Sequence, residues 1–167
     1  MEYEKTIVET KVYLEPENVN DNYEAYLLSK LRQNLEKSAN ESIGIIKSID
    51  AIENVKDSRI MENSTFIIFT VEVKIERYMP NVNDVLNIFI TKLTSYGIFY
   101  AEEQIRILIP NTYMPEHYVL KKDNNSFVLK NTKNEMIYTD GDLLSIKINE
   151  IKFEKNGFSC LAHIVEK

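Results

Sequence analysis

The sequence predicts an α+β protein, in which a small α+β unit is followed by a five-stranded Greek-key β-barrel. The stretch Val85–Pro110 has the pattern of strands joined by tight reversals, and two further strands are expected at Leu143–Asn149 and Phe158–Ile164. Residues 1–80 instead have the pattern strand, helix, strand, strand. Five short strands with a long excursion before the fourth are typical of a small barrel of the oligonucleotide-binding (OB) type, as in cold-shock and ribosomal proteins.

The first unit is predicted to begin with a strand and a helix. Ile7–Leu14 is rich in β-branched residues and ends before Pro16, which has no amide hydrogen to give to a sheet. Asp21 and Glu24 have the spacing of a capping box, which predicts that a helix begins there. Leucines and tyrosines then recur every three or four residues, which predicts one apolar stripe on a helix of about four or five turns that ends near Ser38.

Two more strands are expected in the first unit, at Ile43–Ile49 and Thr65–Ile75. The segment between them, Asn54–Ser64, is polar and is predicted to be a loop. Ile60 and Met61 are apolar residues inside this loop, and an exposed apolar pair in a loop indicates a partner surface. The alternative is that Ile60 folds back onto the sheet of its own unit.

The boundary between the two units is expected in the segment Tyr78–Asn83. Pro80 makes this segment rigid, and its asparagines tolerate turn geometry. The predicted domains are residues 1–80, a small tip domain, and residues 81–167, the barrel.

Apolar residues alternate along the predicted strands of the barrel. Leu86, Ile88 and Ile90 occupy every second position, as in a half-buried strand. Gly97 can adopt the positive φ that a tight reversal needs. Asn111–Asp142 is long and mostly polar, and a loop of this length inside a compact barrel is usually functional or mobile.

The composition limits the classes of partner. The net charge is −6, which argues against tight binding of nucleic acid by the whole surface, because phosphates are neutralised by Lys and Arg. Residues 1–80 hold 10 basic against 15 acidic residues, and residues 81–167 hold 10 against 11, so the barrel can still carry a local basic face. No apolar run approaches the roughly 20 residues that cross a bilayer, and the charged N-terminus lacks the apolar core of a signal peptide. We therefore expect an intracellular protein without membrane contact.

Patterns of catalysis and metal binding are missing from the sequence. Cys160 is the only cysteine, and His117 and His163 stand alone, so no zinc spacing is present. The chain has only four glycines and contains no nucleotide-binding glycine motif and no Gly-x-Ser-x-Gly elbow. We expect no enzymatic activity, no cofactor and no metal.

Short motifs follow one another in a defined order along nearly the whole chain. They are Val12–Pro16, Leu31 with Leu35, Gly44–Ile46, Arg59-Ile60, Phe69–Val71, Tyr78–Pro80, Asn83–Val85 and Tyr96–Phe99. In this order and spacing the chain resembles the stalk subunit of multisubunit DNA-dependent RNA polymerases, the family of the eukaryotic seventh subunit and its archaeal counterpart. It looks most like the short members found in large cytoplasmic DNA viruses, because it ends within a few residues of its last strand. Family glycines are replaced at Asn83, at Ile88 and within Asn54–Ser64, where Asn83 can still supply a positive φ.

The resemblance implies a non-catalytic role in transcription. The first unit would dock on the polymerase core near the clamp, through Pro16, Val19, Arg59, Ile60 and Met61. A small helical partner subunit would pack against the stalk, and the barrel would lie near emerging single-stranded RNA to support initiation and transcript handling. The location would be the nucleus for a cellular member, and the virion and host cytoplasm for a viral one.

A groove with aromatic and basic residues is the expected RNA site of the barrel. Phe99 lies two residues after Gly97, where related barrels place a base-stacking aromatic residue, and Tyr96 and Phe89 are weaker candidates of the same kind. The basic residues expected in this groove are Lys92, Arg106, Lys121 and Lys122. The alternatives are that Phe99 packs beneath Asn111–Asp142 and that the charges only keep the protein in solution.

Two other functions stay open on the sequence. One is a free-standing adaptor of translation or RNA decay that binds single-stranded RNA. The other is a scaffold whose barrel binds protein and never RNA.

Overall fold

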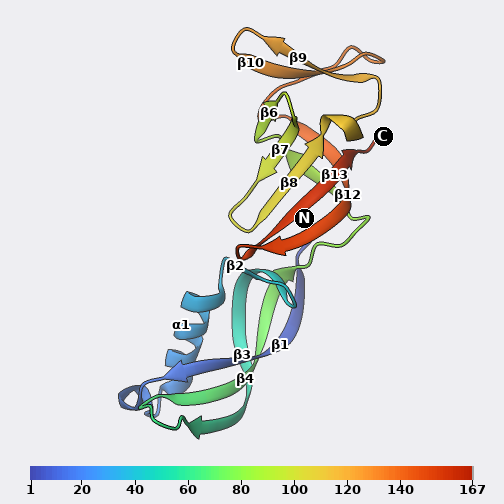
Figure 1. The fold of residues 1–167 in the computed structure, drawn as a ribbon. Coiled ribbons are helices and arrows are strands. Elements are labelled where there is room, and N and C mark those ends of the chain that lie inside the picture. Colours follow the sequence, from blue (N-terminus) through green and yellow to red (C-terminus); the bar gives the residue numbers. More distant parts are fainter. Residues whose placement is uncertain (167) are drawn as a thin grey trace. The chain divides into compact units, whose positions relative to one another are not determined.

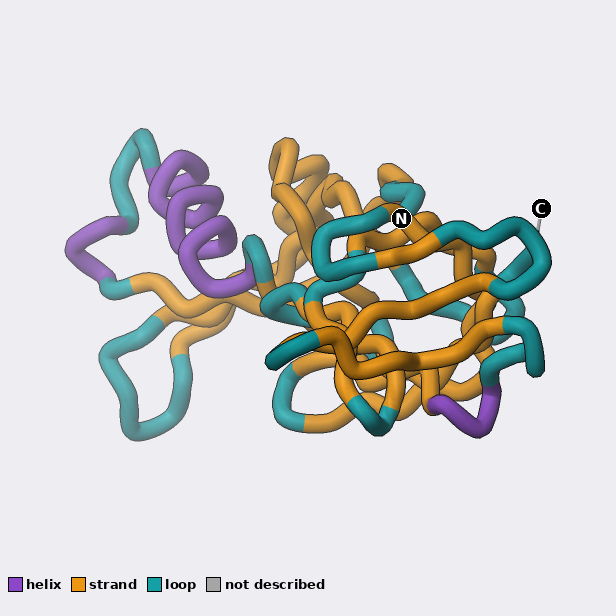
Figure 2. Tube along the Cα trace, turned by 90° about the horizontal axis from the view of Figure 1, so that it is seen from above, coloured by secondary structure: helices purple, strands orange, loops and turns teal. Residues whose placement is uncertain are grey.

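A computed structural model describes residues 1–166, and over these residues the protein is α+β, with one α-helix and several β-sheets. The chain divides into two compact units, Glu2–Met79 and a second unit that begins at Pro80. Strands, which are orange in Figure 2, make up most of both units. None of the helices formed by residues 1–166 has the length and the apolar character that crossing a membrane requires.

The first unit is a four-stranded antiparallel sheet with one helix on its face (Figure 1). Its strands are β1 (Glu4–Leu14), β2 (Ser38–Asn40), β3 (Gly44–Ile60) and β4 (Ile67–Tyr78), in the order β1-β4-β3-β2. The 3₁₀ turn η1 (Pro16–Asn18) and the helix α1 (Tyr23–Leu35) connect β1 to β2. The predicted helix is therefore present, and it ends close to the expected position.

The helix does not begin with the predicted capping box. Its N-cap is Asn22, and this residue makes no capping hydrogen bond with its side chain. The amide of Asn22 instead donates to the Asn20 Oδ1 at 2.9 Å, so the loop before the helix is closed by a local side-chain turn. The pair Asp21 and Glu24 has the right spacing, but the chain enters the helix one residue later than the motif requires.

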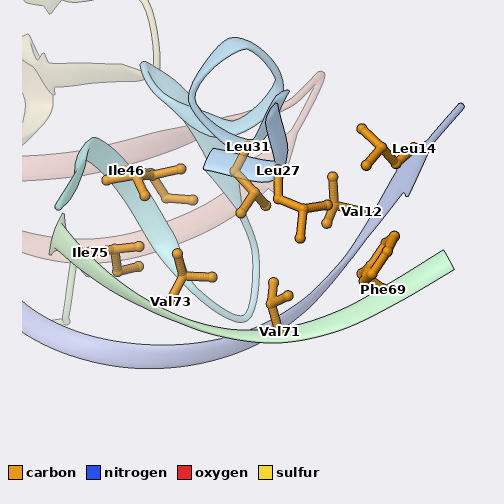
Figure 3. Close-up of a cluster of buried hydrophobic side chains, with 10 residues drawn as sticks. Val12, Leu14, Leu27, Leu31, Ile46, Phe69, Val71, Val73 and Ile75 are labelled. Carbon is orange, nitrogen blue, oxygen red and sulfur yellow. The ribbon is translucent and has the colours of Figure 1, made fainter. Parts of the chain in front are cut away.

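Alternate residues of β1 and β4 form a core with α1, as Figure 3 shows. Val12 and Leu14 point to the same side as Val71 and Val73, and Leu27 of the helix packs against them. A fully buried Leu or Val side chain stabilises a fold by about 1.5–3 kcal/mol relative to an exposed one. The apolar stripe of α1 therefore holds the helix on this face of the sheet.

Strand β3 has an unusual period of three. Its register with β4 shifts four times. At each shift, one additional residue of β3 has no partner on β4, and it follows two residues that do pair. The residues that contact the core are Ile46, Ile49, Ile52 and Val55, and the additional residues are Lys47, Asp50, Glu53 and Lys56. Each shift is a β-bulge, which bends the strand and restores the apolar residue to the core side.

This finding corrects the prediction of a loop at Asn54–Ser64. The strand continues to Ile60, and the reversal to β4 occupies only residues 61–66. Apolar and polar residues after Asn54 do not alternate with a period of two, so the sequence pattern does not predict a strand there.

The bulged residues carry the charges of the outer face of this sheet. Lys56 Nζ lies 2.8 Å from Glu9 Oε2 and 3.1 Å from Glu72 Oε1. Lys5 Nζ lies 2.8 Å from Asp50 Oδ2. These pairs are exposed and therefore contribute little stability, but they place charged groups on the outer face, opposite the apolar core.

The second unit contains a six-stranded sheet in the order β5-β12-β13-β8-β7-β6. Its strands are β5 (Val85–Phe89), β6 (Lys92–Thr94), β7 (Gly97–Ala101), β8 (Ile105–Pro110), β12 (Leu143–Glu154) and β13 (Gly157–Ile164). Strand β13 pairs with β8 in parallel, and the other pairs are antiparallel. The first and last strands of the order, β5 and β6, are successive parts of one stretch, so the sheet closes on itself through residues 85–94.

The interior of this sheet follows the predicted alternation. Leu86, Ile88 and Ile90 are all buried, and the residues between them are exposed. The same pattern continues in the other strands with Ile98, Tyr100, Ile105, Ile107, Ile109, Ile146, Ile148, Cys160, Ala162 and Ile164. Burial raises the pKa of the Cys160 thiol to about 11, so this cysteine stays protonated as a small apolar residue of the core.

Residues with positive φ lie at the turns that need them. Gly97 has φ +148° and Asn83 has φ +74°, as both were expected to do. A side chain at Gly97 would overlap the carbonyl oxygen of Ile109 on the adjacent strand β8. Gly97 is thus required by both its backbone conformation and the close approach of Ile109.

The segment Asn111–Asp142 is not the open loop that was predicted. After the 3₁₀ turn η2 (Asn111–Tyr113) it forms a separate three-stranded sheet in the order β11-β10-β9. These strands are β9 (Tyr118–Asp123), β10 (Ser126–Asn131) and β11 (Ile137–Tyr138), and the first two form the hairpin labelled in Figure 1. Charged residues at the tip of this hairpin gave the segment its polar appearance in the sequence.

Candidate functional sites

A row of side chains crosses the outer face of the second unit. In the strand register, Lys92 pairs with Phe99, and Phe99 pairs with Leu108. Leu108 then pairs with Leu161, and Leu161 pairs with Glu150. Neighbouring strands lie about 4.8 Å apart, so this row spans five strands at right angles to their direction.

A groove of about 390 Å³ runs along this row. Its lining includes Phe99, Leu108 and Leu161, which are all half-buried and form an apolar floor. Because Ile98 and Tyr100 are buried on the inner side, Phe99 presents its ring to the outer face. An aromatic ring beside two leucines is a surface on which the apolar face of a nucleobase can lie.

Basic side chains stand beside this floor. Arg106 lines the groove and is exposed, and Lys92 is exposed next to Phe99. Among residues 1–166 neither of these two cations has an ion pair within 4 Å. The structure therefore places three of the predicted RNA-binding residues, Phe99, Lys92 and Arg106, on one face.

The other four predicted RNA-binding residues neither line this groove nor belong to its row of side chains. Phe89 is 64% exposed on β5, where it pairs with Leu143, and Tyr96 is 76% exposed in the turn between β6 and β7. Lys121 and Lys122 lie on β9, in the separate three-stranded sheet. Phe89 is thus on a strand that does not pair with β7 or β8, Tyr96 is in a turn, and the two lysines belong to another sheet.

No residue of Asn111–Asp142 is found among the described residues that line the groove. The alternative position of Phe99 beneath this segment therefore lacks support in the structure. Phe99 is half-buried and lines the groove instead.

The hairpin of β12 and β13 contributes residues that sequence reasoning missed. Its groove residues are Glu150, Ile151, Lys152, Ser159, Cys160 and Leu161. Leu161 and Ser159 could have been found, since they alternate with Cys160 and Ala162, which face the core. Glu150 could not be placed in this way, because its orientation depends on a register shift between Ile148 and Glu150.

The predicted docking residues gather at one end of the first unit. The register pairs Leu14 with Ile67 and Ile67 with Ile60, so η1 and the reversal after β3 lie at the same end of the sheet. We call this end the tip, and it contains the predicted residues Pro16, Val19, Arg59, Ile60 and Met61. The exposed apolar side chains Tyr13 and Phe66 add to it.

Ile60 is open to solvent at the tip. Its side chain is 75% exposed, although its register partner Ile67 packs against the core. The structure thus contradicts the alternative in which Ile60 folds back onto its own sheet. A large aliphatic side chain with this exposure at the end of a strand is available to a partner.

Local bonds define the shape of the tip. The amide of Met61 donates to the Phe66 carbonyl oxygen at 3.2 Å, and Asn63 supplies a positive φ of +60° in the reversal. The Lys30 ammonium donates to the Glu15 carboxylate at 2.9 Å, which connects η1 to the helix. At Asn63 an asparagine thus adopts the positive φ that glycine commonly supplies in such turns.

No family model matches the chain. The chain is 23% identical over 110 residues to the soybean (Glycine max) protein DNA-directed RNA polymerase II subunit RPB7, and this alignment covers 66% of the chain and 62% of the soybean protein. It is 20% identical over 112 residues to the corresponding subunit of Dictyostelium discoideum, with 67% of the chain and 65% of that protein covered. A solved structure of the apo form of Mycoplasma genitalium RNase R matches 50% of this chain and 13% of its own, with a TM-score of 0.39 and 28% identity.

The soybean and Dictyostelium proteins have the same description. Both are subunits of DNA-directed RNA polymerase II, and both are matched over slightly less than two thirds of their own length. Over about two thirds of its length, the chain is therefore similar to subunits of RNA polymerase II.

Proposed function

We propose that this protein is a non-catalytic stalk subunit of a multisubunit DNA-dependent RNA polymerase. The observation that carries the proposal is its similarity to two polymerase II subunits over about two thirds of the chain. The arrangement of the chain supports it as well, since a compact α+β unit with an open apolar tip is followed by a mostly β unit with a groove. The proposed domains are residues 1–80 for docking and residues 81–167 for the barrel.

In this proposal the tip docks on the polymerase core near the clamp. Pro16 is the first residue of η1, and the exposed Val19 follows that turn. Arg59 and Ile60 are exposed at the end of β3. Exposed apolar residues with a neighbouring cation suit an interface whose centre is apolar and whose rim is polar. A small helical subunit is the second protein partner in this proposal.

The second unit is proposed to be an OB-type barrel that receives single-stranded RNA. Its strand order supports this assignment, because β5 and β6 count as one bent strand and close a five-stranded circuit. The groove beside Phe99 offers a stacking surface and the unpaired cations Lys92 and Arg106. In the assembled polymerase this groove would lie near emerging RNA, and the binding is weak because few cations take part.

The proposed location follows from the proposed assembly. A cellular member works in the nucleus, and a viral member works in the host cytoplasm and is packaged in the virion. Short viral stalk subunits remain the proposed subgroup.

Capture of the large polymerase subunits tests this proposal. Affinity-tagged protein is purified from its source cell, and native mass spectrometry identifies what it carries. The expected result is a complex that contains the two largest polymerase subunits. Purification of the protein without any polymerase subunit would overturn the proposal.

A substitution at the tip tests where the docking occurs. Ile60→Asp introduces a charge into the proposed interface, so we expect the capture of polymerase subunits to fall at least about tenfold. Ile7→Asp is a matched control, because Ile7 is also exposed but lies in the middle of β1, away from the tip. Equal capture by both variants would show that the tip is not the docking surface.

The groove also favours a second candidate, a free-standing adaptor that binds single-stranded RNA. It differs from the first proposal in its protein partners, since an adaptor would carry RNA but no polymerase subunit. A protein-binding scaffold, the third candidate, would carry neither, and replacement of Phe99 by Ala would not weaken any specific RNA crosslink.

A further inference from the structure

The groove on the second unit contains a carboxylate. Among the described residues that line the groove, Glu150 is the only acidic one, and it stands at the end of the row that begins at Lys92. A carboxylate repels phosphate, so a groove that only followed an RNA backbone would gain nothing from it. Its presence beside an apolar floor points to a hydrogen-bond acceptor for a base.

A register shift directs Glu150 to the outer face. On β12, Ile146 and Ile148 point into the core, and continued alternation would bury residue 150 as well. The β-bulge at Asn149 reverses the phase, so Glu150 pairs with Leu161, and Ile151 pairs with the buried Cys160. The Asn149 Oδ1 lies 2.6 Å from His163 Nδ1, which ties the bulge to the neighbouring strand.

Both oxygens of Glu150 are available to a ligand. Over residues 1–166 Glu150 has no ion pair within 4 Å, and the nearby Lys152 is paired with Glu154 at 3.2 Å instead. A carboxylate accepts hydrogen bonds and donates none. The ligand group at this end of the groove must therefore be a donor.

We propose that Glu150 makes the groove selective for guanine in single-stranded RNA. This inference rests on the proposed binding of RNA in the groove. Guanine carries two adjacent donors on its Watson–Crick edge, N1–H and N2–H, which match the two oxygens of a carboxylate. Adenine and cytosine place an acceptor beside their amino group, and uracil places its one N–H between two carbonyl oxygens. These acceptors face the second oxygen of the carboxylate, so only guanine binds it with two hydrogen bonds.

The selected guanine is not the base that stacks on Phe99. Phe99 and Glu150 are separated by three strand spacings, or about 14 Å. A strand of RNA that crosses the sheet therefore places one base on Phe99, leaves the next over Leu108 and Leu161, and presents a later base to Glu150. The stacking site tolerates every base, and the carboxylate supplies the selectivity.

Fluorescence anisotropy with the full chain tests this inference. The probes are short 5′-labelled uridine oligonucleotides in which one central nucleotide is G, A, C or U. We expect the G probe to bind about fivefold or more tightly than the other three, which is the lower range for a bidentate base contact at an exposed site. Glu150→Gln replaces one acceptor oxygen by a donor, so this preference is expected to disappear.

Glu154→Gln is the matched control, because it removes the same charge from the same strand at a residue that does not line the groove. Both variants are expected to bind the A, C and U probes somewhat more tightly through the lost repulsion, and only Glu154→Gln is expected to keep the guanine preference. Equal binding of the four probes by the native protein, or a preference that survives in Glu150→Gln, would overturn the inference.

Phe99→Ala separates this failure from failure of the proposed RNA groove. If Phe99→Ala weakens all probes while the native protein shows no guanine preference, the groove binds RNA and Glu150 does not select the base. If no probe binds, or if Phe99→Ala binds as well as the native protein, the RNA groove itself is wrong, and the inference about Glu150 falls with it.

Discussion

Single residues decide which face of the second unit can meet a ligand. Phe99 stands between Ile98 and Tyr100, both buried, so the alternation of one strand is enough to expose its ring. Its neighbours across the sheet are Lys92 and Leu108, which supply a cation and an apolar surface. The sequence allowed the orientation of Phe99 to be predicted, but its neighbours became known only through the strand register.

Replacement of Phe99 by Ala is expected to weaken the binding of single-stranded RNA by about 1–3 kcal/mol, because it removes one stacking surface. The dissociation constant for an oligouridine, measured by fluorescence anisotropy, checks this prediction. Phe89→Ala is the control, since Phe89 is an exposed aromatic residue outside the groove. Equal losses in the two variants would show that the stacking site is elsewhere.

Gly97→Ala is expected to destabilise the second unit by about 2 kcal/mol or more. The new methyl group would overlap the Ile109 carbonyl oxygen, and the alanine would have to adopt a strained positive φ. Gly141→Ala provides the comparison, because Gly141 has φ +92° but no atom within 4 Å of the place that a Cβ would take. Urea unfolding of both variants measures the difference, and equal stabilities would contradict the role given to the close approach.

At the scale of elements, β3 shows where sequence patterns fail. The expected strand ended at Ile49, yet the structure continues it to Ile60, with an apolar residue at every third position from Ile46 to Val55. A period of three arises only when one unpaired, bulged residue follows every two residues that pair with the neighbouring strand. Such bulges depend on that neighbouring strand and not on the sequence of β3 alone. The helix α1 was predictable for the opposite reason, since its apolar stripe is a property of the helix alone.

The connection between η1 and α1 is expected to depend on pH. The hydrogen bond from Lys30 holds the pKa of Glu15 below its ordinary value of 4.5. A carboxyl group whose pKa is lower in the folded state stabilises that state above the unfolded pKa, and this contribution is lost as the pH falls through the folded value. Lys30→Gln should therefore lower the melting temperature slightly at pH 7, and this effect should shrink as the pH falls below 4.5.

Lys11→Gln is the matched control for this measurement, because Lys11 has no ion pair within 4 Å among residues 1–166. The effect of Lys11→Gln on the melting temperature should not shrink as the pH falls. An effect of Lys30→Gln that does not shrink as the pH falls below 4.5 would mean that Glu15 is not the relevant partner of Lys30.

At the scale of the whole molecule, charge limits how the protein can hold RNA. The net charge is −6, and the cations that stand in or beside the groove without an ion pair within 4 Å among residues 1–166 are Lys92 and Arg106. Composition alone predicted that the whole surface does not bind nucleic acid, and the groove beside Phe99 is the proposed local exception. Lys121 and Lys122 were grouped with this site only because their separate sheet was not recognised in the sequence.

The salt dependence of RNA binding measures how many cations take part. Two phosphate contacts predict a slope of about −1.4 for the logarithm of the binding constant against the logarithm of the salt concentration. Anisotropy titrations of a short oligouridine at several salt concentrations give this slope. A slope of about −3 or steeper would show that Lys121 and Lys122 also contact the strand.

The bulges of β3 have one more consequence. After Ile46, the outer edge of β3 pairs with no other strand within residues 1–166, and such an edge would ordinarily recruit a strand from another molecule. Four interruptions, each with a charged side chain, leave no straight run of backbone donors and acceptors for an incoming strand to match. The same irregularity that concealed this strand in the sequence thereby makes its open edge a poor template for a strand of another molecule.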